Sequence, residues 1–441
     1  MSKLKSWVGL ILFLYLTGCQ HQIQKRFESD IEQYADLLRL PLLVVGVAEG
    51  DSLVYFKSVG SALQDTGITI TPNHMFPIAS ITKSFTAAAM QQMEDEGIIS
   101  LSDRIDHYPN AYFNENRWNE NTTIAHVLSH TSESQPVGSN FIYNGGKYNL
   151  AFNVFQQINA EIDTGAVTKP FTMEIQKRIL DPQGLKHTLV EYNQAQHAAL
   201  KKFQTALYTF DRDQQQYRLV SSDWEQMQCG PGYGMISSVG DLTKYSNSLN
   251  ENEIIKAESY QRLTTPFYQG SPYGLGWFTT AFEGYDLHWG YGYGDYDSAI
   301  LLRVPSKNLT LVVLSPCSIP SESTRLGFGN PMNSPIVASF VKNYLLDMPK
   351  YSFYQQKTET IIERINSQDS RVLLEEAFSV LTTVILSPTT NDSQKEQASE
   401  QLKALVLRFP EDQLWESTTV FEVIAQLEDE QLLKHFLDRV H

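Results

Sequence analysis

Hydrophobic residues recur at helical spacing near the start of the chain and with strand-like patterning soon afterwards. Residues 26–40 have an apolar face, which predicts an amphipathic helix. The positions on this face are Ile31, Tyr34, Leu37 and Leu38. Two apolar, β-branched runs then flank Glu49, Gly50 and Asp51, and this pattern predicts a β-hairpin.

The middle of the chain has mainly helical patterning. An apolar helix is predicted from about Ser80 to Glu96, because Gly97 occupies the position where helices commonly end. Residues 101–245 show helical patterns joined by loops rich in glycine, asparagine, serine and proline. This composition indicates an α-rich insertion.

Strand patterns return late in the chain, in the segments 273–282, 298–305 and 309–316. One early hairpin and several late strands, with helices between them, predict an α/β protein of the α+β type. Its mostly antiparallel sheet, flanked by helices, would join the start of the domain to its end. The order of elements argues against a parallel sheet built from strand-helix-strand units.

The tail, residues 351–441, is predicted to be a separate α-helical region. Its amphipathic helices are broken at Pro388 and Pro410, and acidic residues outnumber basic ones. This excess charge is typical of a solvated helix face, and a docking surface for a protein partner is the alternative.

The composition of the 441-residue chain allows a large core, and its charge limits the possible partners. A formal net charge of -16 argues against a nucleic-acid-binding protein, because no basic run offsets the repulsion of a polyanion.

Residues 1–18 have the order of a secretory signal peptide. Two lysines precede an apolar run that is too short to cross the roughly 30 Å hydrocarbon core of a bilayer. The Leu-Thr-Gly-Cys sequence that follows resembles a bacterial lipobox, which implies that Cys19 is lipidated and becomes the mature N-terminus. Residues 19–29 would then be a tether. The predicted location is the bacterial cell envelope, held to a membrane by the lipid; Gln20 favours the periplasmic face of the outer membrane in a Gram-negative cell.

Two further cysteines, Cys229 and Cys317, either pair in an oxidising envelope or remain buried thiols, and the sequence leaves both open. His126 and His130 share a possible helix face, but no third ligand stands at metal spacing. No metal site and no cofactor are predicted.

Candidate chemistry stands at the start of the apolar helix, in Ser80-Ile81-Thr82-Lys83. Residues three apart share a helix face, so Lys83 can reach the Ser80 hydroxyl. A serine becomes a nucleophile when a neighbour takes its proton, and a lysine kept neutral can do this. The positive end of the helix favours both changes. By itself the spacing is also that of a serine cap beside a solvated lysine.

Further motifs follow in order, and with Ser80 and Lys83 they resemble the serine hydrolases grouped with class C β-lactamases, D-alanyl-D-alanine carboxypeptidases and related esterases. The segments are "TTIAHVLSHTSE", "FIYNGGKY", "ILDPQGLKHT", "GYGMISSVGDLTKY", "YGLGW" and "LHWGYGYGDYDSAILLRVPSKNLTLVVLS". The resemblance covers residues 30–345 and implies a β-lactamase/transpeptidase-like hydrolase domain over residues 30–350.

The resemblance assigns a role to each matching residue. Ser80 is the acylated nucleophile, Lys83 its base, and Tyr143 the phenol that moves the proton to the leaving group. Tyr143 would act as a base near neutral pH only if Lys83 depresses its pKa. His288 would act electrostatically, or by bonding Tyr143 or the substrate, with a packed histidine as the alternative.

In the same strand motif, Gly290 would let the strand approach the substrate. The backbone N–H groups of Ser80 and Tyr291 would form the oxyanion hole.

Three departures from the family pattern affect the substrate. Gly145 stands where an asparagine is usual, and Asn144 is expected to substitute only by a shift of one residue. Trp289 replaces a small hydroxyl residue, and Glu133 replaces a glycine. These changes argue against β-lactams.

The predicted function is an envelope lipoprotein serine hydrolase that forms an acyl-enzyme on ester or D-amino-acid peptide bonds of a small-molecule or peptidoglycan-like substrate. The alternative is a degenerate relative that binds a cell-wall fragment or a protein partner.

Overall fold

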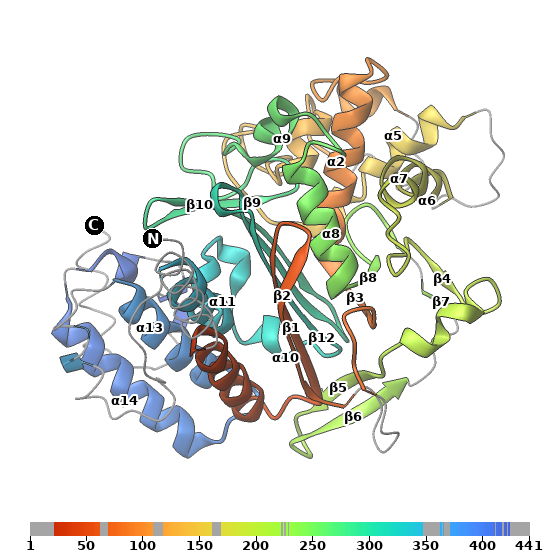
Figure 1. Cartoon of the computed structure of the whole chain (residues 1–441). Coiled ribbons are helices and arrows are strands. Elements are labelled where there is room, and N and C mark those ends of the chain that lie inside the picture. The colour runs from red at the N-terminus through yellow and green to blue at the C-terminus, as the bar shows by residue number, and fades with distance from the viewer. Residues whose placement is uncertain are drawn as a thin grey trace, which may run out of the picture. The chain divides into compact units, whose positions relative to one another are not determined.

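A computed structural model of the chain is shown in Figure 1. It describes residues 22–61, 69–108, 118–160, 169–221, 224, 226–227, 229–346, 362–363, 365, 371–410, 412–416, 419–420 and 422–423. The predicted signal peptide and Cys19 lie outside the described residues. Within the described segments, no helix is both long and apolar enough to span a bilayer.

One six-stranded sheet organises the larger part of the chain. Its strand order is β2 (Ser52–Gly60), β1 (Leu42–Glu49), β12 (Leu309–Ser315), β11 (Ser298–Val304), β10 (Tyr285–Tyr293) and β9 (Phe278–Phe282). Every neighbouring pair is antiparallel, and β1 pairs with β12, with Val44 opposite Leu314. The sheet therefore joins the first strand to the last, as predicted, and the early hairpin is confirmed (Figure 1).

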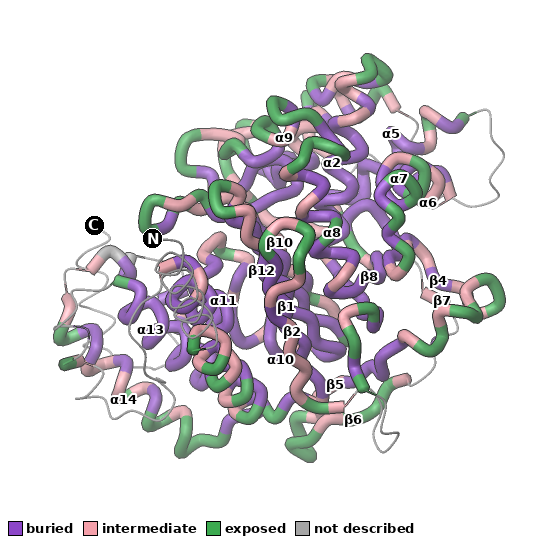
Figure 2. The backbone as a smooth tube through the Cα atoms, viewed as in Figure 1, coloured by how far each residue is buried: buried purple, intermediate pink, exposed green. Residues whose placement is uncertain are grey.

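Helices α2 (Thr82–Asp95) and α8 (Val239–Asn250) share an apolar core with the central strands. Phe85 of α2 stacks on Tyr245 of α8 with ring centroids 3.9 Å apart, and α8 contacts β12 and β1. Figure 2 shows buried backbone along these elements. Because α2 is buried on nearly all sides, a polar group at its first turn is held firmly and largely away from water.

The segment predicted as an α-rich insertion does contain several helices. They are α3 (Ile124–Leu128), α4 (Gly145–Tyr148), α5 (Ala151–Ile158), α6 (Lys169–Ile175) and α7 (Asp181–Gln183). Among the described residues, the same segment also contributes strands to three two-stranded sheets, which the helical prediction missed. The pairs are β3 (Met75–Pro77) with β8 (Ile236–Ser238), β4 (Tyr192–Asn193) with β7 (Gln226–Met227), and β5 (Leu207–Asp211) with β6 (Gln216–Ser221).

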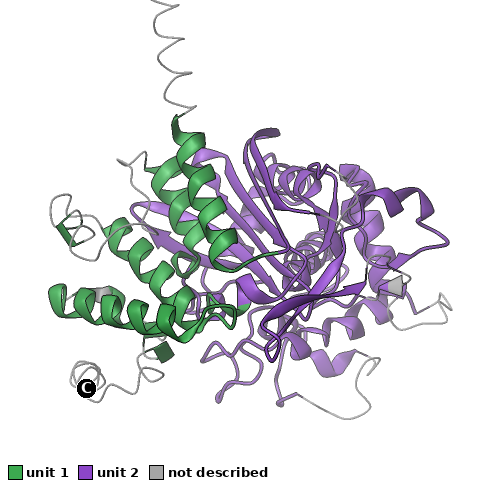
Figure 3. Ribbon diagram, turned by 90° about the horizontal axis from the view of Figure 1, so that it is seen from below, with its two compact units in different colours: residues 1–40, 322–325, 331–441 green, residues 41–321, 326–330 purple. Residues whose placement is uncertain are grey.

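The chain divides into two compact units, coloured in Figure 3. The larger consists of residues 41–321 with 326–330, and the smaller of residues 1–40, 322–325 and 331–441. These limits differ from the predicted domain boundaries at residues 30 and 350. The early amphipathic helix, observed over residues 22–37, belongs with the C-terminal helices.

The smaller unit has its own core. Helices α13 (Arg371–Leu386) and α14 (Asp392–Arg408) pack together, and Leu37 of the early helix joins their apolar cluster. Asn391 begins α14 with a capping box, in which its side chain accepts from the Gln394 N–H. These two helices confirm the helical character predicted for the described part of the tail.

A buried group of charges connects segments of the smaller unit that are far apart in sequence. The Lys342 ammonium lies 3.2 Å from Asp30 Oδ2 and also bonds Glu376. Ser339 Oγ donates to the same Asp30 oxygen at 2.5 Å. All three charged side chains are buried. Burial and Asp30 raise the pKa of the Glu376 carboxyl, and the nearby Lys342 opposes this rise.

We expect Lys342→Ala to lower the free energy of unfolding by about 3–5 kcal/mol, because it leaves two buried carboxylates without their cation. Lys403→Ala is the matched control. Lys403 pairs with the mostly exposed Glu400 at 3.0 Å, and such pairs contribute about 1 kcal/mol or less. Chemical denaturation of the full chain measures both variants. Equal losses of stability would contradict the role given to the buried cluster.

Candidate active site

The backbone turns sharply just before Ser80. Ser80 lies in the 3₁₀ turn Ala79–Ile81, which runs directly into α2. Ala79 has a left-handed conformation, with φ of +40°, which a residue with a Cβ rarely adopts. The Ser80 side chain is partly exposed at the positive end of α2, where a developing alkoxide is stabilised.

Lys83 reaches back to the serine, as the spacing predicted. Its Nζ lies 2.8 Å from Ser80 Oγ and donates to the carbonyl oxygen of Gly232 at 2.6 Å. The side chain is 1% exposed, and the rings of Tyr143 and Tyr148 lie 5.1 and 5.3 Å from the amine. Burial lowers the pKa of Lys83 to about 7. The amine is therefore substantially neutral near pH 7, with a lone pair to accept the serine proton.

Tyr143 completes a connected set of three polar side chains. Its hydroxyl is hydrogen-bonded with the Ser80 side chain. Its ring lies 5.8 Å from that of Tyr291 and 5.9 Å from that of Phe278. Burial raises the pKa of Tyr143, and Tyr291 adds to the rise. The condition for Tyr143 to act as a base, a depressed pKa, is therefore not met in the free protein, and Lys83 is the better base.

His130 holds the segment that carries Tyr143, a role that sequence reasoning missed. Its ring lies 4.2 Å from the Tyr143 ring, and its Nδ1 accepts from the Asn144 N–H at 3.2 Å. Burial lowers the pKa of His130 well below its ordinary value, and Lys83 contributes to this. His126 instead accepts from the Thr123 N–H at the start of α3. No local signal in the sequence separates these two histidines.

Among the described contacts, the Asn144 side chain has none with Lys83. Its Oδ1 accepts from the Lys147 N–H at 3.0 Å, and its Nδ2 donates to Glu133 at 2.6 Å. The side chain is thus used in starting α4 and in bonding Glu133. A Cβ at Gly145 would lie 3.6 Å from Lys83 Nζ. A side chain at this position would therefore contact the amine, and the glycine places none there.

His288 bonds Tyr260, and Tyr143 was one of several partners or roles that the sequence left open for it. Its Nδ1 lies 2.9 Å from the Tyr260 hydroxyl. Burial lowers the pKa of His288 to about 4, and Arg303, its neighbour across β10 and β11, adds to this. Among the described contacts His288 has none with Tyr143. The His288 ring is therefore neutral near pH 7, and a bond to the substrate stays a prediction.

The rest of the strand motif separates into two faces, because neighbouring side chains of a strand alternate. Trp289 is buried, stacks on Phe278 at 4.3 Å and donates to Thr280 at 3.2 Å, so its bulk lies in the aromatic packing. Gly290 has open space at its Cβ position. Tyr291 contacts the Tyr143 ring, and the oxyanion role of its N–H stays a prediction.

Cys229 and Cys317 are both free and buried. Burial raises the pKa of the Cys229 thiol well above its ordinary value and that of Cys317 to about 11. The question of pairing, which the sequence left open, is therefore answered in favour of two thiols.

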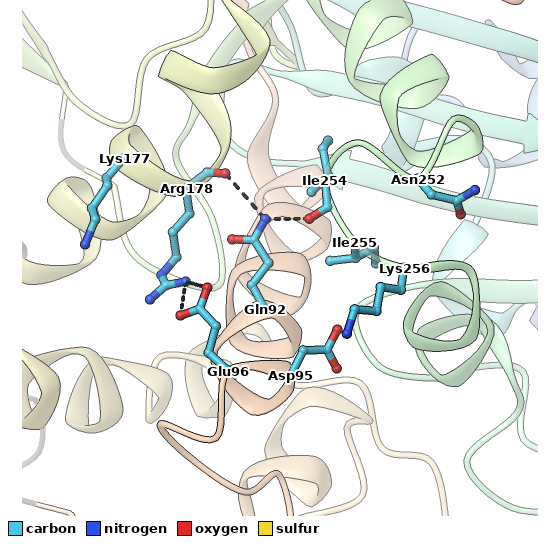
Figure 4. A pocket seen from close by; sticks show the side chains of 9 residues that line it. All are labelled: Gln92, Asp95, Glu96, Lys177, Arg178, Asn252, Ile254, Ile255 and Lys256. Carbon is cyan, nitrogen blue, oxygen red and sulfur yellow. Dashed lines mark hydrogen bonds and ion pairs between the residues drawn. The ribbon is translucent and has the colours of Figure 1, made fainter.

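A polar hollow of about 450 Å³ lies at the other end of α2 (Figure 4). Several of the residues that line it are hydrogen-bonded to one another. Gln92 donates to the Ile254 carbonyl at 2.6 Å, and Arg178 bonds Glu96 at 2.8 and 2.9 Å. Because α2 has 14 residues, this hollow lies roughly 20 Å from Ser80 and takes no part in its chemistry.

Comparison with known proteins gives one family match. The family model described as Beta-lactamase matches residues 27–326. Penicillin-binding protein 4* of Bacillus subtilis is 24% identical over 354 residues, which cover 70% of this chain and 77% of that protein. Protein flp of Staphylococcus aureus (strain MW2) is 24% identical over 340 residues, which cover 67% of this chain and 63% of that protein. The match thus spans less than two thirds of the Staphylococcus aureus relative.

Solved structures share the fold. The octameric penicillin-binding protein homologue from Pyrococcus abyssi has a TM-score of 0.58 at 21% identity and covers 77% of this chain and 81% of its own. The beta-lactamase/D-alanine carboxypeptidase from Yersinia pestis has a TM-score of 0.54 at 18% identity and covers 73% of this chain and 99% of its own. A D-stereospecific amidohydrolase from Streptomyces has a TM-score of 0.53 at 18% identity, covering 67% and 94%. The predicted β-lactamase/transpeptidase-like fold is confirmed.

Proposed function

This chain belongs to the beta-lactamase family of serine hydrolases, and from that premise we propose that it forms an acyl-enzyme at Ser80 and passes the acyl group to water. The observation that carries the proposal is the buried Lys83 amine, 2.8 Å from Ser80 Oγ, with its pKa lowered to about 7. A lysine bound only as a structural cation would be paired with a carboxylate, and no such partner of Lys83 is found among the described residues.

The geometry supports a simple sequence of steps. Ser80 Oγ attacks the substrate carbonyl carbon, and its proton moves to neutral Lys83. The N–H groups of Ser80 and Tyr291 would bind the resulting oxyanion. Tyr143, protonated and bonded with Ser80, passes a proton to the leaving group as the carbonyl re-forms, and recovers one from Lys83. Water then attacks the carbonyl carbon of the acyl-enzyme and gives its proton to the neutral Lys83 amine. As the bond between the acyl carbon and Ser80 Oγ breaks, Ser80 Oγ takes up a proton from this set, and the free acid and the free serine are released.

We infer that ester or D-amino-acid peptide bonds are better substrates than β-lactams. The ring contacts of Tyr143, Phe278 and Tyr291 give the site an aromatic wall. An aromatic wall of this kind favours an apolar acyl group. The D-amino-acid reading is supported by the structural neighbours from Yersinia pestis and Streptomyces.

The proposal includes a lipid anchor at Cys19 and a place in the bacterial cell envelope, supported by the order of charged, apolar and small residues at the N-terminus. An intact mass equal to that of the unmodified chain, measured on protein extracted from membranes, would contradict it.

Hydrolysis of a p-nitrophenyl ester is expected to rise with pH through about 7. Lys83 is protonated below its lowered pKa and neutral above it, and only the neutral amine accepts the serine proton. The value of kcat/KM should therefore increase about tenfold per pH unit on the acid side and level off above about pH 8.

This profile also decides between catalysis and the alternative. Active protein with a flat profile would remove Lys83 from the role of base. A well-folded protein that hydrolyses neither phenyl esters nor D-amino-acid amides at any pH would favour the degenerate relative that binds a cell-wall fragment or a protein partner.

A further inference from the structure

The left-handed residue before the nucleophile needs support. A residue with a Cβ at φ of +40° is strained, and such conformations persist when neighbouring contacts fix them. One contact comes from within the turn, where Thr82 Oγ1 donates to the Ala79 carbonyl at 2.6 Å. This hydrogen bond fixes the carbonyl group of Ala79, and the Ala79 N–H needs a different partner.

That partner is Asp297, in the turn between β10 and β11. Its carboxylate accepts hydrogen bonds from the N–H groups of Ala79 and Tyr296. The residue is 8% exposed, and the charge near it is Asp295, which repels. A buried carboxylate with two backbone donors and a like charge as its neighbour contributes little to stability through ion pairing. The hydrogen bond between the Asp297 carboxylate and the Ala79 N–H therefore explains better than ion pairing why a carboxylate is buried at this position.

Glycines on the neighbouring strand and turn allow this close approach. A Cβ at Gly292 would lie 2.4 Å from the Ile78 carbonyl oxygen, one residue before Ala79. A Cβ at Gly294 would lie 2.2 Å from Asp297 Oδ1, and the Gly294 N–H donates to the Asp297 carbonyl at 3.1 Å. The turn is shaped to bring a carboxylate against the backbone that precedes Ser80.

We propose that Asp297 is a positioning residue for the acylation of Ser80, acting by holding Ala79 in its left-handed conformation; this inference rests on the proposed acyl-enzyme function. Burial raises the pKa of Asp297 to about 6, so at neutral pH the side chain is mostly the carboxylate, the stronger acceptor. If the bond is lost, Ala79 relaxes and Ser80 Oγ moves away from Lys83 Nζ.

The first test compares Asp297→Ala with Asp297→Asn. Displacing a nucleophile by about 1 Å costs up to about a hundredfold in rate, so we expect Asp297→Ala to lower kcat for ester hydrolysis about ten- to a hundredfold, with KM within about twofold. Asp297→Asn retains an acceptor oxygen and should stay within about fivefold of the wild type. Asp286→Ala, at an exposed position of β10, is the control and should retain full activity.

The second test separates positioning from a general loss of stability. Glycine adopts a φ of +40° without strain, so Ala79→Gly should recover at least about threefold of the kcat lost in Asp297→Ala. If Asp297→Ala does not fold, Asp297→Ser replaces it, because a neutral hydroxyl is a weaker acceptor than the carboxylate.

The outcomes are distinct. A wild type that acylates, with Asp297→Ala equally active or not improved by Ala79→Gly, would overturn the positioning role and leave the proposed function standing. A wild type that never acylates would overturn both. Loss in Asp297→Ala, retention in Asp297→Asn and recovery with Ala79→Gly support the proposal.

Discussion

Replacing Ser80 by alanine is expected to abolish covalent labelling and to lower ester turnover by about 10⁴-fold or more. The hydroxyl is the one group in the described site that is bonded to both Lys83 and Tyr143, so removing it leaves the proton route without a nucleophile. Loss of a nucleophile from such a set typically removes most of the catalysis that the set provides together. The measurement is the intact mass after a fluorophosphonate probe, followed by the hydrolysis rate.

Ser84→Ala is the matched control for this experiment. Ser84 lies on the same helix and is buried, but its hydroxyl donates to the Ile81 carbonyl at 2.8 Å. This variant should take up one probe molecule, like the wild type. An adduct that survives in Ser80→Ala would identify another nucleophile and contradict the acyl-enzyme at Ser80.

Lys83→Met is expected to lower kcat/KM by at least about a hundredfold, the lower end for loss of a general base. Methionine keeps much of the buried aliphatic volume and removes the amine. Lys83→Arg should be equally impaired, because a guanidinium stays charged and accepts no proton. In both variants the rise of activity through about pH 7 should disappear. Burial lowers the pKa of Lys83 to about 7, and this rise follows the titration of that amine.

The cost of these changes to stability is expected to be small beside their effect on the rate. The Gly232 carbonyl loses its 2.6 Å donor in Lys83→Met, which costs about 1–3 kcal/mol, but the burial of an amine is relieved at the same time. Lys307→Met, at an exposed position, is the control. Turnover that is unchanged in a folded Lys83→Met protein would refute its role as the base.

Elements with a strong local pattern were predictable from the sequence. The first hairpin and the helix after Ser80 follow from alternation and helical spacing, and the contact between Ser80 and Lys83 is itself local. The β5–β6 hairpin was missed, because the segment from Leu207 to Ser221 was grouped with the helical patterns around it. Asp30 and Lys342 are 312 residues apart in the sequence, and no local pattern predicts that they pair.

The site shows the same limit. Tyr143 was found through the family resemblance, since its distance in sequence from Ser80 gives no spacing rule. Its raised pKa depends on the rings that enclose it, which come from other elements. The partners of Asn144 and His288 were also decided by packing: Glu133 and Tyr260 approach from elsewhere in the chain.

The two buried thiols have a practical consequence for how this protein responds to oxidants. A thiol with a raised pKa supplies almost no thiolate, and Cys229 and Cys317 are also shielded from reagents. Alkylation of either sulfur requires local opening of the surrounding core. The rate of alkylation therefore measures how often that core opens.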